Sequence, residues 1–322
     1  MKKISIIVPI MAKNIQNLNS FCSCYNKLSA EKDLNIFIID NSEDHIFNYI
    51  QNNLNKNISH TKPDVSIKNG KNKKMINVQS GIMLAKKYKC DVSILFDDDM
   101  RPTLNNILDI KKSINRGNIF CCMIDYKTPD FFDLIDLSGI YLVNFIFNFS
   151  QIWGNIGFDL SLIEAEHFDT MKLKDSMYDE LTLKIFLRSK GGIDCYFNEI
   201  RIPMLSSQRN IFSFLEQRIR YAYENIGNFW INTFCLSIIP LFISMVYFLG
   251  FKFTLSIFII FSLMIIFITY TSSILNKYDN KFIASLFSVI WFYSYSITSW
   301  IANFIYIFGG YRRNGNLIKR SI

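Results

Sequence analysis

Three long apolar segments near the end of the chain limit what it can fold into more than any other feature. They cover Ile231–Gly250, Phe253–Leu275 and Phe282–Gly309, with a very short turn between the first two. As a helix, each segment is long enough to cross about 30 Å of hydrocarbon, and a helix satisfies its own backbone polar groups in lipid. The sequence therefore predicts a membrane region of two or three helices over residues 229–311, followed by a basic tail over residues 312–322.

The topology of this region stays open at the level of the sequence. Three crossings that start from a cytoplasmic domain would place Arg312–Arg320 on the far side of the membrane, against the positive-inside tendency. Either one segment is re-entrant or lies flat on the membrane, or the tendency is overridden here.

Residues 1–228 have the composition of a soluble domain. The whole chain of 322 residues is 50% hydrophobic and 19% charged, with a net charge of +8. Seven basic residues and one acidic residue lie from Phe229 onward, so residues 1–228 are nearly neutral. This excludes a uniformly basic surface for nucleic acid, and we expect no nucleic-acid partner. The seven cysteines are irregularly spaced, so free thiols are expected.

The first domain reads as alternating strands and helices. Short β-branched runs predict strands over Ile4–Pro9, Asn35–Ile39, Val92–Phe96 and Ile119–Ile124. Capping residues and charge patterns predict helices over Lys71–Lys89, Leu104–Asn115, Ser176–Lys190 and Asn210–Asn225. This alternation predicts an α/β fold with a mostly parallel sheet flanked by helices. The uncharged stretch Leu137–Ser150 is too short to span a bilayer and is either a buried core helix or an interfacial helix.

Carboxylates follow two of the predicted strands. Asp97, Asp98 and Asp99 come directly after a buried strand, and Asp40 ends another. Ligands of open α/β sheets bind at the carboxyl ends of the strands, and hard oxygen ligands suit Mg²⁺ or Mn²⁺ with a phosphate. The alternatives are a solvated acidic turn for the triplet and an ordinary turn for Asp40.

Two helices carry further polar groups. Asp179 and Glu180 open the helix Ser176–Lys190, where the helix dipole keeps carboxylates ionised and suits a general base; simple helix-start chemistry is the alternative. Gln217, Arg220 and Tyr221 share one helix face and could grip a pyrophosphate and stack on a sugar. The alternative for this second helix is a basic-aromatic helix at the membrane interface.

Taken in order, these stretches resemble the family 2 glycosyltransferases with a GT-A fold, in particular the membrane-bound branch with a Q-x-x-R-W motif. The matching stretches are Ser5–Pro9, Ile38–Ser42, Lys73–Lys74 with Gln79–Gly81, Phe96–Asp99, Asp179–Glu180 with Leu187–Gly191, and Gln217–Tyr221. Asn41 stands where the family has a second acid, and Tyr221 stands in place of Trp, which weakens an inference of processive synthesis.

The resemblance implies a role for each matching position. The residues that would bind the nucleotide sugar are Pro9, Asp40, Asn41, Lys74, Asp97 and Asp98. The residues that would hold a divalent metal are Asp97 and Asp99, and those that would meet the acceptor or the pyrophosphate are Gln217, Arg218, Arg220 and Tyr221. Glu180 takes the position of the general base by its spacing to Gly191, with Asp179 as the alternative.

The activity implied is inverting transfer of a sugar from a nucleotide-diphosphate sugar, with UDP as the expected nucleotide. The expected acceptor is a lipid-linked or growing polysaccharide chain at the cytoplasmic face of the inner membrane, with Mg²⁺ or Mn²⁺ as cofactor and membrane lipid as a partner. Two alternatives stay open: a transferase that makes a simple glycolipid or polyprenyl-phosphate sugar, and a non-catalytic membrane scaffold.

Overall fold

The computed structural model describes residues 2–67, 72–126, 128–146, 155–163, 179–206, 210–313 and 316–318. Its contacts divide the chain into two units: Met1–Lys127 with Ile152–Leu205, and Thr128–Gln151 with Ser206–Arg320. The predicted domain over residues 1–228 therefore differs from the first compact unit, because two of its segments join the long apolar helices. That residues 1–228 form the catalytic domain, with the membrane region beginning at residue 229, stays a prediction.

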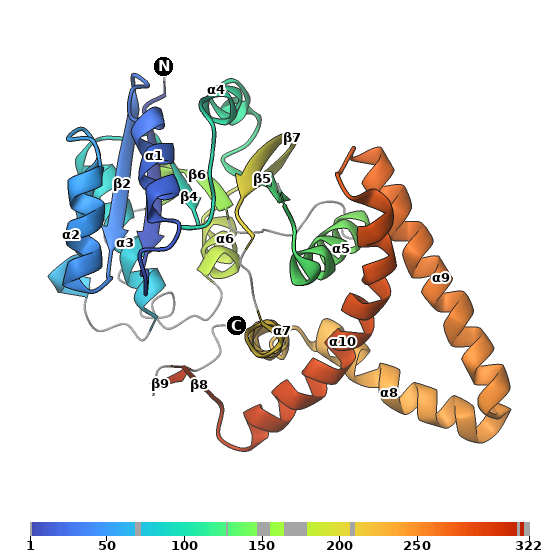
Figure 1. Ribbon diagram of the computed structural model, residues 1–322. Helices are drawn as coiled ribbons and strands as arrows, with labels where there is room; N and C mark the ends of the chain where they lie inside the picture. The colour runs from blue at the N-terminus through green and yellow to red at the C-terminus, as the bar shows by residue number, and fades with distance from the viewer. Residues whose placement is uncertain are drawn as a thin grey trace. The chain divides into compact units, whose positions relative to one another are not determined.

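A seven-stranded sheet forms the centre of the first unit (Figure 1). Its strands, in spatial order, are β3 (Ser59–Thr61), β2 (Leu34–Asp40), β1 (Ile4–Ile10), β4 (Val92–Phe96), β6 (Asn155–Asp159), β5 (Ile119–Tyr126) and β7 (Asp194–Met204). Only β6 runs against its neighbours in this part of the structure. The predicted α/β class with a mostly parallel sheet is confirmed, and all four predicted strands are present.

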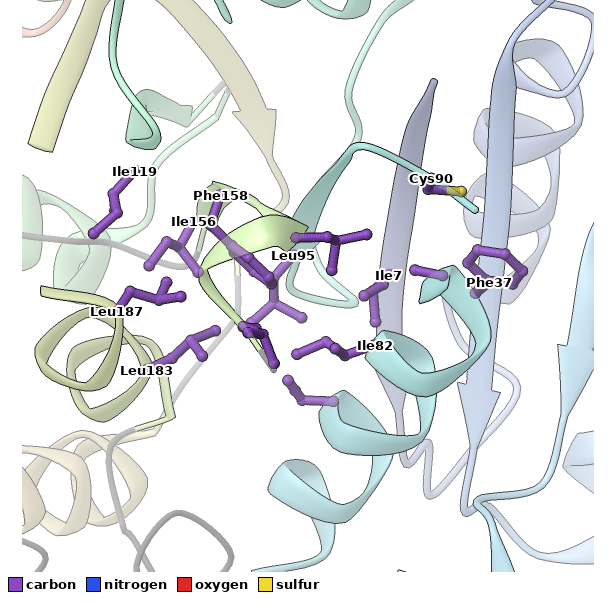
Figure 2. Packing of buried hydrophobic residues seen from close by; sticks show 14 of the residues in the cluster. Ile7, Phe37, Ile82, Cys90, Leu95, Ile119, Ile156, Phe158, Leu183 and Leu187 are labelled. Carbon is purple, nitrogen blue, oxygen red and sulfur yellow. The ribbon is translucent and has the colours of Figure 1, made fainter. Parts of the chain in front are cut away.

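Helices flank this sheet and bury its apolar side chains. They are α1 (Leu18–Leu28), α2 (Asp44–Asn53), α3 (Lys73–Lys87), α4 (Leu104–Ser113) and α6 (Asp179–Ser189), with short 3₁₀ turns η1 (Val65–Ile67), η2 (Ile114–Arg116) and η3 (Leu160–Leu162). Figure 2 shows Ile82 of α3 beside Ile7 of β1, and Leu183 and Leu187 of α6 near Ile156 of β6. One continuous core therefore joins α3 and α6 through the strands.

Close approach of α3 to β1 depends on a glycine. A Cβ atom added to Gly81 would lie 2.3 Å from Cγ2 of Ile7, which is far inside van der Waals contact. Because Gly81 has no side chain, α3 can pack closely against β1.

The second unit is helical. It contains α5 (Phe131–Ile146), α7 (Ile211–Asn225), α8 (Phe229–Leu249), α9 (Phe251–Leu275), α10 (Lys281–Ile307) and a small hairpin of β8 (Tyr311–Arg313) and β9 (Asn316–Ile318). Helices α8, α9 and α10, of 21, 25 and 27 residues, are long and apolar enough to cross a membrane. Gly250, with φ of 80°, makes the single-residue turn between α8 and α9.

Helix α5 is buried within this second unit. Its residues Ile135, Leu142 and Val143 pack in one cluster with Ile265 of α9 and Trp291 of α10. Residues 137–144 of the predicted stretch are buried, in agreement with a buried core helix, and residues 147–150 lie outside what the structure describes. The partners of the helix are the long apolar helices rather than the sheet. All seven cysteines are described, and none of them forms a disulfide.

Candidate functional site

The strand order places a topological switch point beside β1. From β1 the chain adds β2 and β3 on one side, and it then returns to add β4 on the other side. The last pairing of β1 with β2 joins Ile10 to Asp40, and the last with β4 joins Ile7 to Leu95. Both neighbours run parallel to β1, so their carboxyl ends lie toward the same edge of the sheet. Open α/β sheets bind ligands at such a switch point. Asp40 and the acidic triplet both lie at this edge.

The acidic triplet forms a tight turn after β4 that is tied to β7. The amide of Met100 donates to the carbonyl of Asp97 (3.0 Å), and the carbonyl of Asp99 accepts from the amide of Leu205 (3.0 Å). The amide of Arg101 donates to the carbonyl of Pro203 (2.7 Å), so the turn is held at both ends. The turn is thus a fixed platform for its carboxylates.

Lys74 on α3 meets the first of these carboxylates. Its Nζ donates to Oδ1 of Asp97 at 2.6 Å, and the two side chains are 33% and 21% exposed. Asn72, which precedes the helix, accepts from the amide of Lys74 (3.0 Å) and caps α3 at this point. The capped helix start therefore directs a lysine at the acidic turn, while Asp98 is exposed to solvent.

One carboxylate oxygen of Asp99 lies in an environment that favours a bound cation. Its Oδ1 is buried and has no hydrogen-bond partner. Burial, followed by the charges of Asp97 and Asp98, raises the pKa of Asp99 well above its usual range, although Lys74 and Arg101 act in the other direction. A buried carboxylate oxygen without a partner is costly, and a divalent cation would relieve that cost.

The donor set fits Mg²⁺ or Mn²⁺ only together with a ligand. Among the residues that the structure describes, no three His, Cys, Asp or Glu side chains converge as a complete metal site. Mg²⁺ is commonly held by one or two carboxylates plus phosphate oxygens and water. Asp97 and Asp99 can supply the carboxylates, so the site fits a cation that arrives with a diphosphate.

Asp40 lies at the same edge but faces the protein. Its side chain is fully buried; Oδ1 accepts from the amide of Ser42 (2.7 Å), and Oδ2 lies 3.0 Å from Nε2 of His60. Burial raises the pKa of Asp40, and the hydrogen bonds from His60 and Ser42 lower it. Together these hydrogen bonds outweigh burial, so the pKa of Asp40 lies below its usual value. The carboxylate is therefore ionised and already bonded at both oxygens.

The neighbouring predicted residues shape the edge. Pro9 is buried within β1, where it pairs with Ile39. Asn41 is half-buried, and its amide donates to the carbonyl of Ile10 (3.0 Å). Pro9 thus belongs to the core side of the strand, and Asn41 is the more accessible of the two.

Asp179 and Glu180 are the first two residues of α6. Their side chains, and residues 176–178 at the start of the predicted helix, lie outside what the structure describes. The prediction that one of these carboxylates is the general base stays a prediction.

The predicted acceptor motif lies on α7 in the second unit. Nε2 of Gln217 donates to the hydroxyl of Tyr221 at 2.7 Å, so these two side chains share a helix face as expected. Arg220 is half-buried, and its Nε has no hydrogen-bond partner. Arg218 is fully buried and forms an ion pair with Asp136 of α5. In this arrangement Arg218 links α7 to α5 within the second unit.

Sequence reasoning missed three residues of the edge. His60 on β3 bonds Asp40, Asn77 on α3 donates to the carbonyls of Ile10 and Ile39 (both 3.0 Å), and Nη1 of Arg101 donates to the carbonyl of Asp98 (2.7 Å). Asn77 stands one helical turn after Lys74, a spacing that could have marked it as inward-facing. Nothing local marks His60, because its partner lies 20 residues away.

No protein-family model and no curated protein matches this chain. Solved structures that resemble it include a protein of Desulfovibrio desulfuricans G20 assigned as a nucleotide-diphospho-sugar transferase. It is 9% identical, covers 64% of this chain and 82% of its own, and has a TM-score of 0.39. Glucosyl-3-phosphoglycerate synthase from Mycobacterium tuberculosis, with Mn²⁺, UDP-glucose and phosphoglyceric acid bound, is 12% identical. It covers 69% of this chain and 78% of its own, with a TM-score of 0.42. These likenesses are to the path of the chain and carry no conclusion about its chemistry.

Proposed function

We propose that this chain is a membrane-associated glycosyltransferase that takes its sugar from a nucleoside-diphosphate donor bound at the carboxyl ends of β1, β2 and β4. The observation that carries the proposal is the buried, unpartnered Oδ1 of Asp99 beside the pair of Lys74 and Asp97. A diphosphate with a divalent cation matches both halves of this arrangement, since the cation meets the carboxylates and the lysine meets phosphate oxygens.

The chain's own residues would divide the work of the reaction. The turn Asp97–Asp99 holds the diphosphate end of the donor, and Lys74 places a positive charge beside the leaving group. When bound, Mg²⁺ or Mn²⁺ supplies further positive charge to that group. Asp97 and Asp99 would hold it.

The transfer step itself needs a base. The acceptor hydroxyl oxygen forms a bond to the anomeric carbon while the bond from that carbon to the diphosphate oxygen breaks. The hydroxyl proton passes to a carboxylate, for which Glu180 is our candidate and Asp179 the alternative. The nucleoside diphosphate leaves with the electron pair of the broken bond. Because the acceptor oxygen attacks from the face opposite the leaving group, the configuration at the anomeric carbon inverts.

The properties of helices α8, α9 and α10 favour the proposal that the acceptor is lipid-linked. Their length and hydropathy suit a bilayer, and many of their large apolar side chains are exposed, including Phe267, Tyr247 and Phe248. An enzyme held in a membrane meets its acceptor there at high local concentration. A lipid-linked or growing polysaccharide acceptor, and the parts played by Gln217, Arg220 and Tyr221 toward it, belong to the proposal.

A donor screen tests the proposal. Detergent-purified protein is mixed with a panel of nucleotide sugars, UDP-sugars first, with and without Mn²⁺, and its thermal unfolding is followed. We expect at least one donor to raise the melting temperature in the presence of Mn²⁺, and Asp99→Asn to abolish that rise. If no donor stabilises the wild-type protein and none is hydrolysed, the proposed function is wrong.

A further inference from the structure

Asp40 is held from all sides by protein groups rather than turned toward solvent. Both of its oxygens have partners, namely the amide of Ser42 at 2.7 Å and Nε2 of His60 at 3.0 Å. The side chains of Asp40 and His60 are both fully buried. A ligand atom therefore has no route to this carboxylate while the pair is intact.

The imidazole of His60 is itself fixed by α2. Its Nδ1 lies 2.8 Å from Oε1 of Gln51, and its ring stacks on Phe47 with centroids 4.2 Å apart and planes 21° from parallel. One ring edge faces Asp40, the other faces Gln51, and one face is covered. The donor at Nε2 is thus aimed at Asp40 with little freedom to turn.

Ser42 connects the Asp40–His60 pair to the loop after β2. Its amide donates to Asp40, its Oγ accepts from the amide of Ala12 (2.8 Å), and its carbonyl accepts from Nζ of Lys62 (2.7 Å). The last two bonds join the segment that follows β2 to the segments that follow β1 and β3. The loop that starts at Asn41 is thereby held at the carboxyl edge of the sheet, with Lys62 exposed beside it.

The position of this loop suits one end of a nucleotide. Strand β2 is separated from β4 by β1 alone, so its end lies about two strand spacings, or 10 Å, from the acidic turn. A nucleoside diphosphate is long enough to cover that span when its phosphates lie at Asp97–Asp99. Its base would then meet Asn41 and Lys62.

We propose that Asp40 and His60 are a buried positioning pair that fixes the Asn41–Ser42 loop for recognition of the nucleotide base, without touching the base themselves. This rests on the proposed function, because it takes the diphosphate to bind at the acidic turn. It changes the role of Asp40 from a ligand to a support, and it adds His60 to the residues that decide which nucleotide binds.

The test compares ligands with and without a base. Binding of UDP and of inorganic pyrophosphate, each with Mn²⁺, is measured by calorimetry on the full chain in detergent. The variants are His60→Leu, which removes the donor, and His60→Gln, which keeps an amide donor. His45→Leu is the matched control, since His45 is an exposed histidine on α2.

Loss of a hydrogen bond to a charged group predicts about tenfold weaker UDP binding in His60→Leu. Pyrophosphate binding should be unchanged, His60→Gln should recover most of the UDP affinity, and His45→Leu should behave as wild type. Gln51→Leu, which loosens the ring without removing it, should weaken UDP in the same direction but less, and it serves if His60→Leu does not fold.

Two results would overturn the inference. One is unchanged UDP binding in both His60→Leu and Gln51→Leu. The other is an equal loss of UDP and pyrophosphate binding, which would mean general damage to the site. If the wild-type protein binds neither ligand, the proposed function fails instead, so the two failures are distinguishable.

Discussion

Lys74 makes the sharpest prediction, because its ammonium group occupies the side of Asp97 that a cation would use. Nζ of Lys74 lies 2.6 Å from Oδ1 of Asp97, and a divalent cation that binds Asp97 must displace or repel it. Replacing the lysine by methionine keeps most of the side-chain volume and removes the charge. We therefore expect Lys74→Met to bind Mn²⁺ more tightly than the wild type in the absence of nucleotide.

The size of the effect follows from the geometry. Two unit charges 2.6 Å apart interact by about 1.6 kcal/mol in a water-like dielectric. This is a lower bound on their attraction, because the side chains are only 33% and 21% exposed and are screened less than in bulk water. Measured exposed pairs are weaker, at about 0.2–1 kcal/mol, and charged hydrogen bonds are stronger. A change of about 1–2 kcal/mol corresponds to a gain of roughly 5- to 30-fold in Mn²⁺ affinity.

Lys74→Met should have the opposite effect on the binding of a nucleoside diphosphate. With Mn²⁺ saturating, Lys74→Met should bind UDP more weakly, because the lysine no longer meets the phosphate oxygens. Free Mn²⁺ is counted by electron paramagnetic resonance during titration, and UDP binding is measured by calorimetry. Lys73→Met, at the exposed neighbouring lysine of α3, is the control and should change neither affinity appreciably. Unchanged or weaker Mn²⁺ binding in Lys74→Met would refute the reasoning.

Three further predictions concern stability. The raised pKa of Asp99 means that its protonated form stabilises the metal-free fold. That contribution is complete below the unfolded-state pKa and is lost as the pH rises through the folded-state pKa. Asp99→Asn should therefore raise the melting temperature more at pH 8 than at pH 5, and an equal rise at both would contradict this. Arg218→Met should cost about 3–5 kcal/mol because it breaks the buried ion pair with Asp136. Asp136→Leu added to it should recover part of that loss in denaturant titrations. No recovery would disprove the pairing. The side-chain amides of Asn303 on α10 and Asn232 on α8 exchange hydrogen bonds at 2.9 and 3.3 Å. Asn303→Leu should therefore destabilise the detergent-solubilised protein by about 0.6–2 kcal/mol. A stability equal to that of the wild type would show that the pair is not needed.

The sequence predicted those parts of the fold whose signal is local. Val92–Phe96 is a short, mostly apolar run with turn residues after it, which predicts a buried strand, and its predicted bounds match β4. The membrane helices carry their own signal in length and hydropathy. By contrast, β6 is short, contains Gly157 and pairs with strands from distant parts of the chain, so its position is decided by tertiary packing that no local pattern records.

The candidate site shows the same division. The triplet Asp97–Asp99 is recognisable from the sequence because three adjacent carboxylates after a strand are unusual. The role of Asp40 depends on His60, Ser42 and Gln51, which meet it only through the pairing of β2 with β3 and the packing of α2. Whether a carboxylate at a strand end faces a ligand or the protein is set by such contacts, and the sequence alone cannot decide it.

The central claim is that the acidic turn holds a divalent cation together with the diphosphate of a nucleotide. The most direct measurement is ³¹P electron–nuclear double resonance on the protein with one equivalent of Mn²⁺ and UDP. We predict a strong manganese–phosphorus coupling in the wild type that is lost from the protein-bound fraction in Asp97→Asn and Asp99→Asn. Bound Mn²⁺ that shows no phosphorus coupling, or a coupling that both variants retain, would contradict the account.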